Sequence, residues 1–371
     1  MSLTAEQPDL RDAVRGLLAR EGQDETSRWR RLCGEVGVAG LAIPERYGGA
    51  GAGPAETGVV MEELGRDLTC SPMLGSAVLA AQVLLAAGDE AACGRLLPAI
   101  ADGSATAALA WSTRAGHWDP GEAGCRAREV AGQAREAPGG WELDGEAHYV
   151  LDGDVADVLL VAARTPAGPG LFEVDPHQEG VSRAATPAMD ATRRLAVVRL
   201  NRARGRRVGG DAAGALGRAR DLACLALGAE QVGAAGRALE LTVGYAMIRE
   251  QFGQVIGGFQ ALRHRLADLH VLVESARALA RAAAGAAGEG GNGEDGRDGG
   301  PDLGRRAAAV KVYCSDALTR TAAEMIQLHG AIGITWEHPA HRYLKRAHGA
   351  RHLFGSPDRH AAAIASSLLD R

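Results

Sequence analysis

An arginine, a phenylalanine and a glutamine stand close together in a glycine-containing stretch of the sequence. These residues are Arg249, Phe252 and Gln260. A guanidinium can bind a phosphate through two parallel hydrogen bonds, an aromatic ring can stack on a base, and an amide can bind a polar edge. The three side chains together therefore suit a dinucleotide cofactor.

Two long helices are predicted on either side of this stretch. Before it, apolar residues recur at steps of three and four from Leu222 to Val243, and the same period resumes from Leu262 to Val273. The pattern places the three side chains at the junction between the two helices.

The spacing of residues around the junction is specific. It follows the order Tyr245-x3-Arg249-x-Gln251-Phe252-Gly253-x2-Ile256-x2-Phe259-Gln260-x5-Leu266-Ala267-Asp268. This order resembles the helical signature of the acyl-CoA dehydrogenase family, whose members are FAD enzymes of fatty acid metabolism that desaturate acyl thioesters. The resemblance implies that Arg249 contacts the FAD pyrophosphate and Phe252 the adenine end, with Gln260 nearby.

A second stretch, Met325 to His338, resembles the family's glutamine–glycine turn over the ADP part of FAD. The resemblance implies that Gln327 donates a hydrogen bond and that Gly330 lets the backbone approach the cofactor. In the family, these groups reach the FAD of a neighbouring subunit. We therefore expect a homo-oligomer, or a hetero-oligomer with a homologue.

The residues that would line the flavin ring match the family less well. Ser112 and Thr113 stand where the family has a hydroxyl, and Tyr149 keeps an aromatic ring. Leu151 replaces a threonine that lies beside flavin N5 in the family. The resemblance thus implies a flavin site that has lost one hydrogen bond.

No carboxylate occupies either position where the family places its catalytic base. Desaturation needs a carboxylate that removes the α-proton of the thioester, while the β-hydrogen leaves as hydride to the flavin. One family position corresponds to Phe354 or Gly355, and the other, on the long helix, to Ala223.

Four other acids remain weak candidates for the base. Asp221, Glu230 and Glu240 share the long helix, and each also fits a solvated or N-terminal helix charge. Glu337 follows Trp336 and also fits a helix cap or a hydrogen bond to His338. The catalytic residue therefore stays unassigned.

Hydrophobic periodicity predicts an α+β chain of the acyl-CoA dehydrogenase type. We expect an N-terminal helical domain over residues 1–108, a central β-barrel over 109–210 and a C-terminal helical bundle over 211–371. Residues 285–304 are rich in glycine and acidic residues and predict a mobile loop.

Composition restricts the class of partner. The 371 residues include 41 basic and 46 acidic residues, which gives no reason to expect nucleic acid. Six cysteines without paired spacing predict reduced thiols and no metal site. The N-terminus lacks a secretory pattern and no apolar run is long enough to enter a membrane. We expect a cytoplasmic protein.

Three functions fit these observations. The chain could be the base-lacking subunit of a hetero-oligomer that pairs with a catalytic homologue. It could instead be a self-sufficient dehydrogenase with a relocated carboxylate, or a flavin monooxygenase or oxidase on the same fold. The resemblance implies a thioester of coenzyme A or of an acyl-carrier protein as substrate, and an electron-transfer flavoprotein or similar acceptor.

Overall fold

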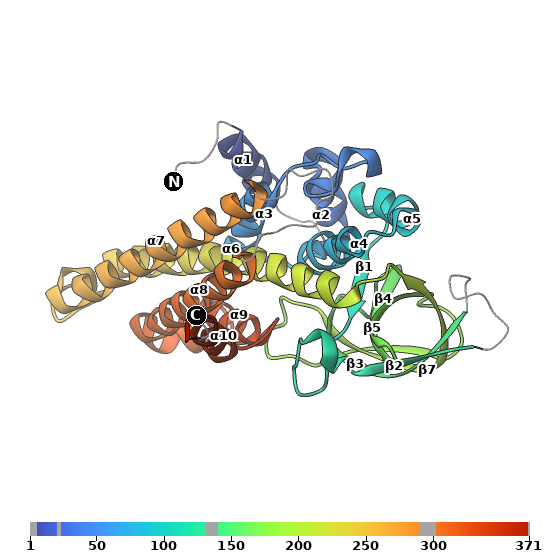
Figure 1. Ribbon diagram of the computed structural model, residues 1–371. Helices are drawn as coiled ribbons and strands as arrows, with labels where there is room; N and C mark the ends of the chain where they lie inside the picture. The colour runs from blue at the N-terminus through green and yellow to red at the C-terminus, as the bar shows by residue number, and fades with distance from the viewer. Residues whose placement is uncertain (1–5, 21–23, 131–139, 290–301, 370–371) are drawn as a thin grey trace.

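The computed structural model describes residues 6–20, 24–130, 140–289 and 302–369. Helices extend to residue 101, strands run from 107 to 208, and helices resume at 212. In Figure 1 the N-terminal helices and α7 lie above the long helix α6, helices α8, α9 and α10 lie below it, and the strands lie to one side. This helix–strand–helix order confirms the predicted fold class, whereas the exact domain boundaries remain predictions.

The N-terminal part is a set of short helices and turns. Asp89 caps α5 by accepting a hydrogen bond from the backbone N–H of Ala92 at 2.9 Å. Met73–Ala80 is a π-helical segment that runs directly into α4, so the two make one buried rod. The helices are α1 (Gln7–Leu18), α2 (Glu25–Arg31), α3 (Pro54–Arg66), α4 (Ala81–Ala87) and α5 (Glu90–Ala101).

The strands form a closed barrel. Their order is β1-β4-β2-β3-β7-β5, and a further pairing of β4 with β5 closes a ring in which β1 and β6 are attached outside. Buried apolar side chains such as Trp141 and Phe172 fill its interior. The strands are β1 (Ala107–Ala110), β2 (Cys125–Glu129), β3 (Trp141–Leu151), β4 (Val158–Thr165), β5 (Gly168–Val174), β6 (Val181–Ala185) and β7 (Leu195–Val208).

Two of these strands were not predicted, and one is longer than predicted. β2 and the outer half of β7 expose arginines and bury only small residues such as Ala127 and Ala203, so their apolar signal is weak. β6 is only partly buried because it lies on the outside of β7. Pairing with neighbouring strands, rather than hydrophobicity, therefore defines these three segments.

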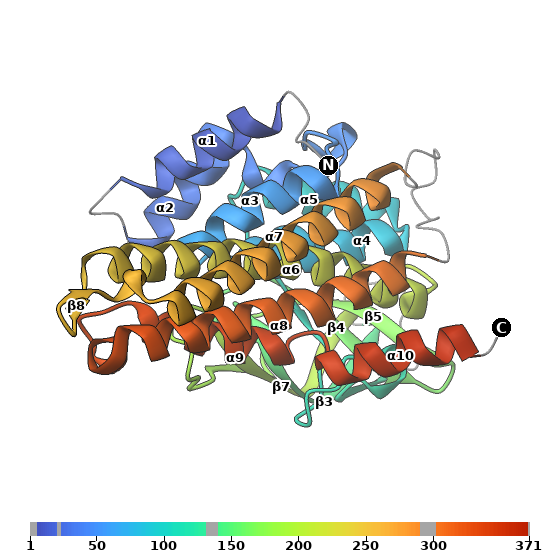
Figure 2. The same cartoon turned by 90° about the vertical axis from the view of Figure 1, so that its left-hand side faces the viewer.

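The C-terminal part is a helical bundle built on α6. Figure 2 shows α6, α7 and α8 lying side by side, with the small β8–β9 hairpin at one end of the bundle. The elements are α6 (Ala212–Ile248), β8 (Glu250–Gln251), β9 (Gln254–Val255), α7 (Gln260–Glu289), α8 (Leu303–His329), α9 (Ala340–His352) and α10 (Pro357–Leu369). The predicted loop 285–304 is shorter than expected, because α7 extends to Glu289 and α8 begins at Leu303; residues between them lie outside the described part.

Helix α6 is buried on every side in its middle, not on one face as its sequence period predicted. Residues 222–236 are all buried. Small residues permit this, because neighbouring backbones touch α6 directly: a Cβ at Gly233 would lie 1.8 Å from the carbonyl oxygen of Glu62. Contacts with α3 and α8 therefore enclose the middle of the helix.

Candidate active site

A ring contact holds the two predicted ADP-binding stretches at the same end of the bundle. Tyr245, one turn before the end of α6, stacks on His329 at the end of α8, with ring centroids 4.4 Å apart. Arg249 follows Tyr245, and Gln327 and Gly330 flank His329. The structure thus brings these sequence-predicted residues together.

The hairpin after α6 presents its aromatic residue to solvent. Phe252 has φ 53° and Gly253 φ 77°, the left-handed values of a tight two-residue hairpin turn. Phe252 is 92% exposed, although bulky residues rarely adopt this backbone conformation. Arg249, Gln260 and Gln327 are exposed as well. These side chains are therefore available to a ligand.

The backbone at Gly330 requires glycine. Its φ of 62° and ψ of −140° lie in a region that side chains with a Cβ avoid. No described atom lies within 4 Å of the place where a Cβ would stand. A ligand can therefore approach this backbone closely, which fits the ADP end of FAD.

The predicted flavin-lining hydroxyl of Ser112 is engaged inside the barrel. Its Oγ donates to the carbonyl of His148 at 2.6 Å, and its side chain is fully buried. The hydroxyl of Tyr149 donates to the carbonyl of Arg114 at 3.2 Å, which folds the loop after β1 against the ring. Thr113 is half-buried and lies in the same loop, so its hydroxyl is the better placed of the two predicted donors.

Phe354, one of the residues that the sequence resemblance aligned with the family's base, is part of an aromatic cluster. Its ring packs edge-on against Trp118 at 5.1 Å between centroids, and Trp118 packs against Trp111 at 5.8 Å. Phe354 is 1% exposed, and the Nε2–H of His360 donates to its carbonyl at 3.0 Å. Ala223, at the other family position, is also fully buried.

A cavity of about 660 Å³ opens beside Phe354 and Gly355. The loop after β1, the first half of α6, the start of α8 and α10 surround it. Its polar lining includes three arginines, two further acids besides Asp221, and a histidine, and its apolar lining comes mainly from α10. The polar residues are Asp119, Arg220, Asp221, Asp302, Arg305, Arg359, His360 and Ser367.

Asp221 is the one of the four candidate acids that lines this cavity. Its side chain is 16% exposed, and the guanidinium of Arg220 donates to it at 3.2 Å. Burial raises the pKa of Asp221 above its ordinary value, and Arg220 opposes that rise. The expectation of a solvated or N-terminal helix charge is therefore wrong for Asp221.

Glu230 lies at the centre of a buried ion network. Both of its oxygens accept from Nη2 of Arg193, at 2.6 and 2.8 Å, and Arg346 also donates to it. Burial alone would raise the pKa of Glu230, but the two guanidiniums outweigh it and hold the pKa below its ordinary value. Glu230 is thus a structural carboxylate, not a solvated charge.

The other two candidate acids lie away from the cavity lining. Glu240 accepts two hydrogen bonds from Arg66, at 2.6 and 2.5 Å, on the side of α6 that faces α3. Glu337 is exposed in the turn before α9, where its own backbone N–H and Thr335 lower its pKa. His338 binds the N–H of Ala340 instead of Glu337.

Several residues beside the site escaped sequence reasoning. Pro357 is the first residue of α10, and a proline at this point is a sequence signal for a helix start. That signal could have placed Arg359 and His360 in the first turn of a helix beside Phe354. Asp152, next to Leu151, is buried, and burial raises its pKa to about 7. In the sequence, Asp152 followed by Gly153 indicates only a turn, so no sequence signal predicted a buried acid here.

Within the described ranges, no cluster of histidine, cysteine, aspartate or glutamate has the arrangement of a metal site. Among the same residues, no helix is both long and apolar enough to cross a bilayer.

Comparison with known proteins identifies the family. Residues 4–104 match the model of the acyl-CoA dehydrogenase N-terminal domain, and residues 211–369 match that of the C-terminal domain. Acyl-CoA dehydrogenase IpdE2 of Mycobacterium tuberculosis strain H37Rv is 37% identical over 345 residues, which cover 93% of this chain and 87% of the relative.

Two solved structures share the fold at appreciable identity. One is titled a Tcur3481-Tcur3483 steroid ACAD G363A variant, with 29% identity, TM-score 0.82 and coverage of 98% of both chains. The other is the ChsE4-ChsE5 complex from Mycobacterium tuberculosis, with 27% identity, TM-score 0.85 and coverage of 100% of this chain and 99% of that chain. The chain described here therefore belongs to the acyl-CoA dehydrogenase family, whose members are FAD-dependent oxidoreductases.

Proposed function

We propose that this chain is the base-lacking subunit of an FAD-dependent acyl-CoA dehydrogenase and acts with a homologous chain that carries the carboxylate base. The observation that carries the proposal is the burial of Phe354 against Trp118 at a family position for the base. A buried aromatic cluster cannot remove a proton, and Ala223 at the second position is equally inert. The base must then come from elsewhere.

The ADP end of the site supports the proposal. Arg249, Gln327 and Gly330 are exposed and lie at one end of the bundle. Ala223 precedes Arg249 by twenty-six residues, and a helix of that length spans about 39 Å. Figure 1 also shows the α6–α7 turn at the tip of the bundle opposite the barrel. A single FAD that reached both Arg249 and Ala223 would have to extend along most of α6. This distance favours the binding of Arg249, Gln327 and Gly330 to the FAD of a partner subunit.

The roles of individual residues follow from their chemistry. The exposed guanidinium of Arg249 would bind the pyrophosphate, the ring of Phe252 would stack at the adenine end, and Gln327 would donate a hydrogen bond. Thr113 and Tyr149 would contact the flavin ring. Bound FAD supplies the acceptor for the β-hydrogen of the thioester.

The 660 Å³ cavity is the proposed thioester site. Arg220, Arg305 and Arg359 can bind the phosphates of a carrier, and the alanines and isoleucine of α10 can contact its apolar part. A relative at 29% identity is titled a steroid ACAD, so a steroid-derived acyl-CoA is the first substrate to test. The ChsE4-ChsE5 relative is a complex of two chains, which supports a paired assembly here.

The test compares the chain alone with the chain co-purified with a homologue that has glutamate at the position of Phe354 or Ala223. Flavin absorbance is recorded anaerobically before and after a steroid-derived acyl-CoA is added, and particle mass is measured by light scattering. We expect a mixed oligomer whose flavin bleaches, whereas the lone chain does not bleach. Robust bleaching by the lone chain would contradict the base-lacking assignment.

A second candidate function is a self-sufficient dehydrogenase with Asp221 as the base. It rests on the position of Asp221 in the lining of the same cavity, with a pKa raised by burial. General-base catalysis contributes about 100- to 10,000-fold, so Asp221→Asn should abolish turnover by the lone chain. Asp152→Asn is the matched control, because Asp152 is buried but does not line this cavity.

A further inference from the structure

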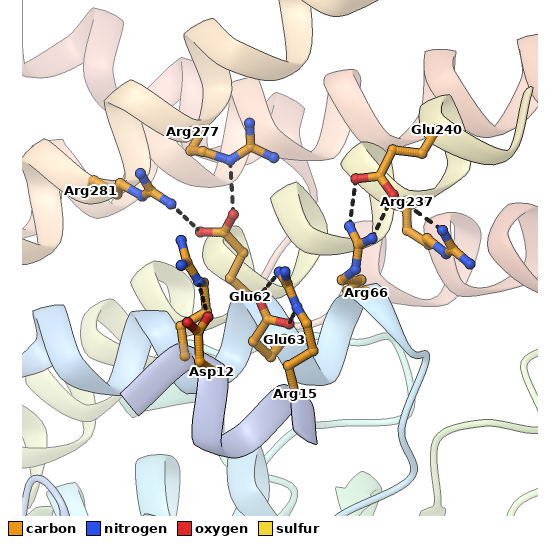
Figure 3. A network of polar contacts seen from close by, with 10 residues as sticks. Asp12, Arg15, Glu62, Glu63, Arg66, Arg237, Glu240, Arg277 and Arg281 are labelled. Atoms are coloured by element: carbon orange, nitrogen blue, oxygen red, sulfur yellow. Dashed lines mark hydrogen bonds and ion pairs between the residues drawn. The ribbon is translucent and has the colours of Figure 1, made fainter. Parts of the chain in front are cut away.

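A second charged cavity, of about 240 Å³, lies at the junction of α1, α3, α6 and α7, where nothing in the proposed reaction uses it. Figure 3 shows charged side chains from these helices converging around it. We call it the arginine pocket. Its lining consists of Gly233, three glutamates and five arginines: Glu62, Glu63, Glu240, Arg11, Arg15, Arg66, Arg277 and Arg281.

Close packing of two helices fixes the walls of the arginine pocket. A Cβ on Gly233 would collide with the backbone of Glu62, so α6 and α3 touch at this point. The contact fixes the spacing of the α3 and α6 backbones that carry Glu62, Glu63, Arg66 and Glu240. Two walls of the pocket therefore come from helices in direct backbone contact.

Each glutamate of the pocket already has both oxygens bound. Glu63 accepts from Nε and Nη2 of Arg15, at 2.8 and 2.7 Å. Glu62 accepts from Nε of Arg277 at 2.8 Å and from Nη2 of Arg281 at 3.1 Å. Glu240 is bound by Arg66 through two nitrogens. The negative charges of the lining are thus already neutralised.

The arginines, in contrast, keep unused donors. A guanidinium has five N–H groups, and two of them serve Glu63 in Arg15 and Glu240 in Arg66. Arg281 donates one hydrogen bond, to Glu62, among the described residues. Arg15 and Arg66 both line the pocket, so two guanidinium groups of like charge border the same cavity.

The positive charge remains in excess when the surrounding residues are included. Asp12 binds Arg11 at 3.0 Å, Glu274 binds Arg277, and Arg237 binds Glu240 at 3.2 Å. The lining residues and these ion-pair partners together contain six arginines and five carboxylates. An anion with several acceptor oxygens would satisfy the free donors and screen the repulsion between the guanidiniums.

The size of the pocket restricts the anion. A volume of 240 Å³ holds about eight waters at about 30 Å³ each, and it is smaller than pockets for drug-sized ligands. We propose that the arginine pocket binds a phosphate group. Because its arginines come from α1, α3 and α7, the bound phosphate would connect the N-terminal helices to the C-terminal bundle.

The test titrates the full chain with inorganic phosphate and with ADP by calorimetry, at constant ionic strength with chloride as the reference salt. We expect phosphate to bind and Arg281→Gln to weaken binding about tenfold or more, because it removes a charged donor. The matched control is Arg126→Gln, an exposed arginine on β2 remote from the pocket. The affinity of the Arg126→Gln variant for phosphate should equal that of the unchanged chain.

Each outcome decides the proposal. Tighter binding of ADP than of phosphate, lost in Arg281→Gln, would identify a nucleotide as the source of the phosphate group; equal or tighter binding of phosphate would identify the free ion. Arg11→Gln provides a second variant if Arg281→Gln does not fold, because Arg11 donates to the exposed carboxylate of neighbouring Asp12 and so supports no contact between helices among the described residues. No phosphate or ADP binding beyond chloride, or the same affinity in all variants, would overturn the proposal.

Discussion

The ring of Phe354 meets the ring of Trp118 edge-on, with centroids 5.1 Å apart. This contact connects the turn between α9 and α10 to the loop after β1, so the C-terminal bundle and the barrel share one aromatic cluster. The residue that the sequence resemblance aligns, with Gly355, to the catalytic acid is a packing residue in this fold. The contribution of the Phe354 ring to the free energy of unfolding can therefore be measured.

Replacing Phe354 with alanine should lower the free energy of unfolding by about 3–5 kcal/mol, because it empties a buried aromatic site. Chemical denaturation of the purified variant checks this value. Phe252→Ala is the control, since Phe252 is 92% exposed and its loss should change the stability by about 0.5 kcal/mol or less. Equal effects of the two substitutions would contradict the buried position of Phe354.

Replacing Glu230 with glutamine should cost about 3–5 kcal/mol, because Arg193 loses its buried counter-charge and Arg346 keeps only that of Asp190. Glu240→Gln, which breaks the half-exposed pair with Arg66, should cost about 0–1 kcal/mol. Denaturation curves of both variants at neutral pH make the comparison.

The ion pairs of Glu230 also predict that the free energy of unfolding depends on pH in the acid range. The folded-state pKa of Glu230 lies below its ordinary value, so its carboxylate stabilises the fold above the unfolded-state pKa, and that contribution is lost as the pH falls. The stability difference between the unchanged chain and Glu230→Gln should shrink in acid. A difference independent of pH would show that Glu230 is not ionised in the fold.

Lys311 predicts a pH effect in the alkaline range. It is fully buried and donates to the carbonyls of Ala350 and Arg351 at 2.8 and 3.0 Å, and burial lowers its pKa from 10.5 to about 8. The unfolded chain therefore holds more protons between these pH values, and stability attributable to Lys311 rises by about 3 kcal/mol across that window.

Lys311→Met removes this titration. Thermal unfolding of both proteins from pH 7 to 10.5 should give a difference curve that changes between pH 8 and 10.5. Subtraction cancels the buried cysteines, which ionise in the unfolded chain over the same range. A flat difference curve would contradict the lowered pKa of Lys311.

Replacing Arg249 with alanine should weaken FAD binding by about 1.5–3 kcal/mol, because a charge-assisted contact to phosphate is lost. Stability should not change, since the Arg249 side chain is exposed and has no protein partner among the described residues. Arg320→Ala, on the exposed face of α8, is the control for nonspecific charge effects. Titration of the apoprotein with FAD measures the difference, and equal affinities in all three proteins would show that the signature has been misinterpreted.

The sequence alone determined the helix–strand–helix order and the family. Long helical periods and the Tyr245-to-Asp268 motif depend on local spacing, which survives without tertiary contacts. Strands β2 and β6 were missed because their position depends on pairing with β3 and β7, and their own residues are too polar or too exposed to mark them.

The tertiary structure decided what the charged residues do. In the sequence, Glu230, Glu240 and Asp221 are three acids on one predicted helix, and the pattern does not distinguish which of them could be the base. In the fold, Glu230 is neutralised by two arginines, Glu240 faces α3, and Asp221 lines a cavity. A carboxylate's chemistry is set by its desolvation and by the charges within a few ångströms. Arg193, Arg346 and Arg66 lie tens to more than a hundred positions from the glutamates that they bind, so only the folded chain brings them together.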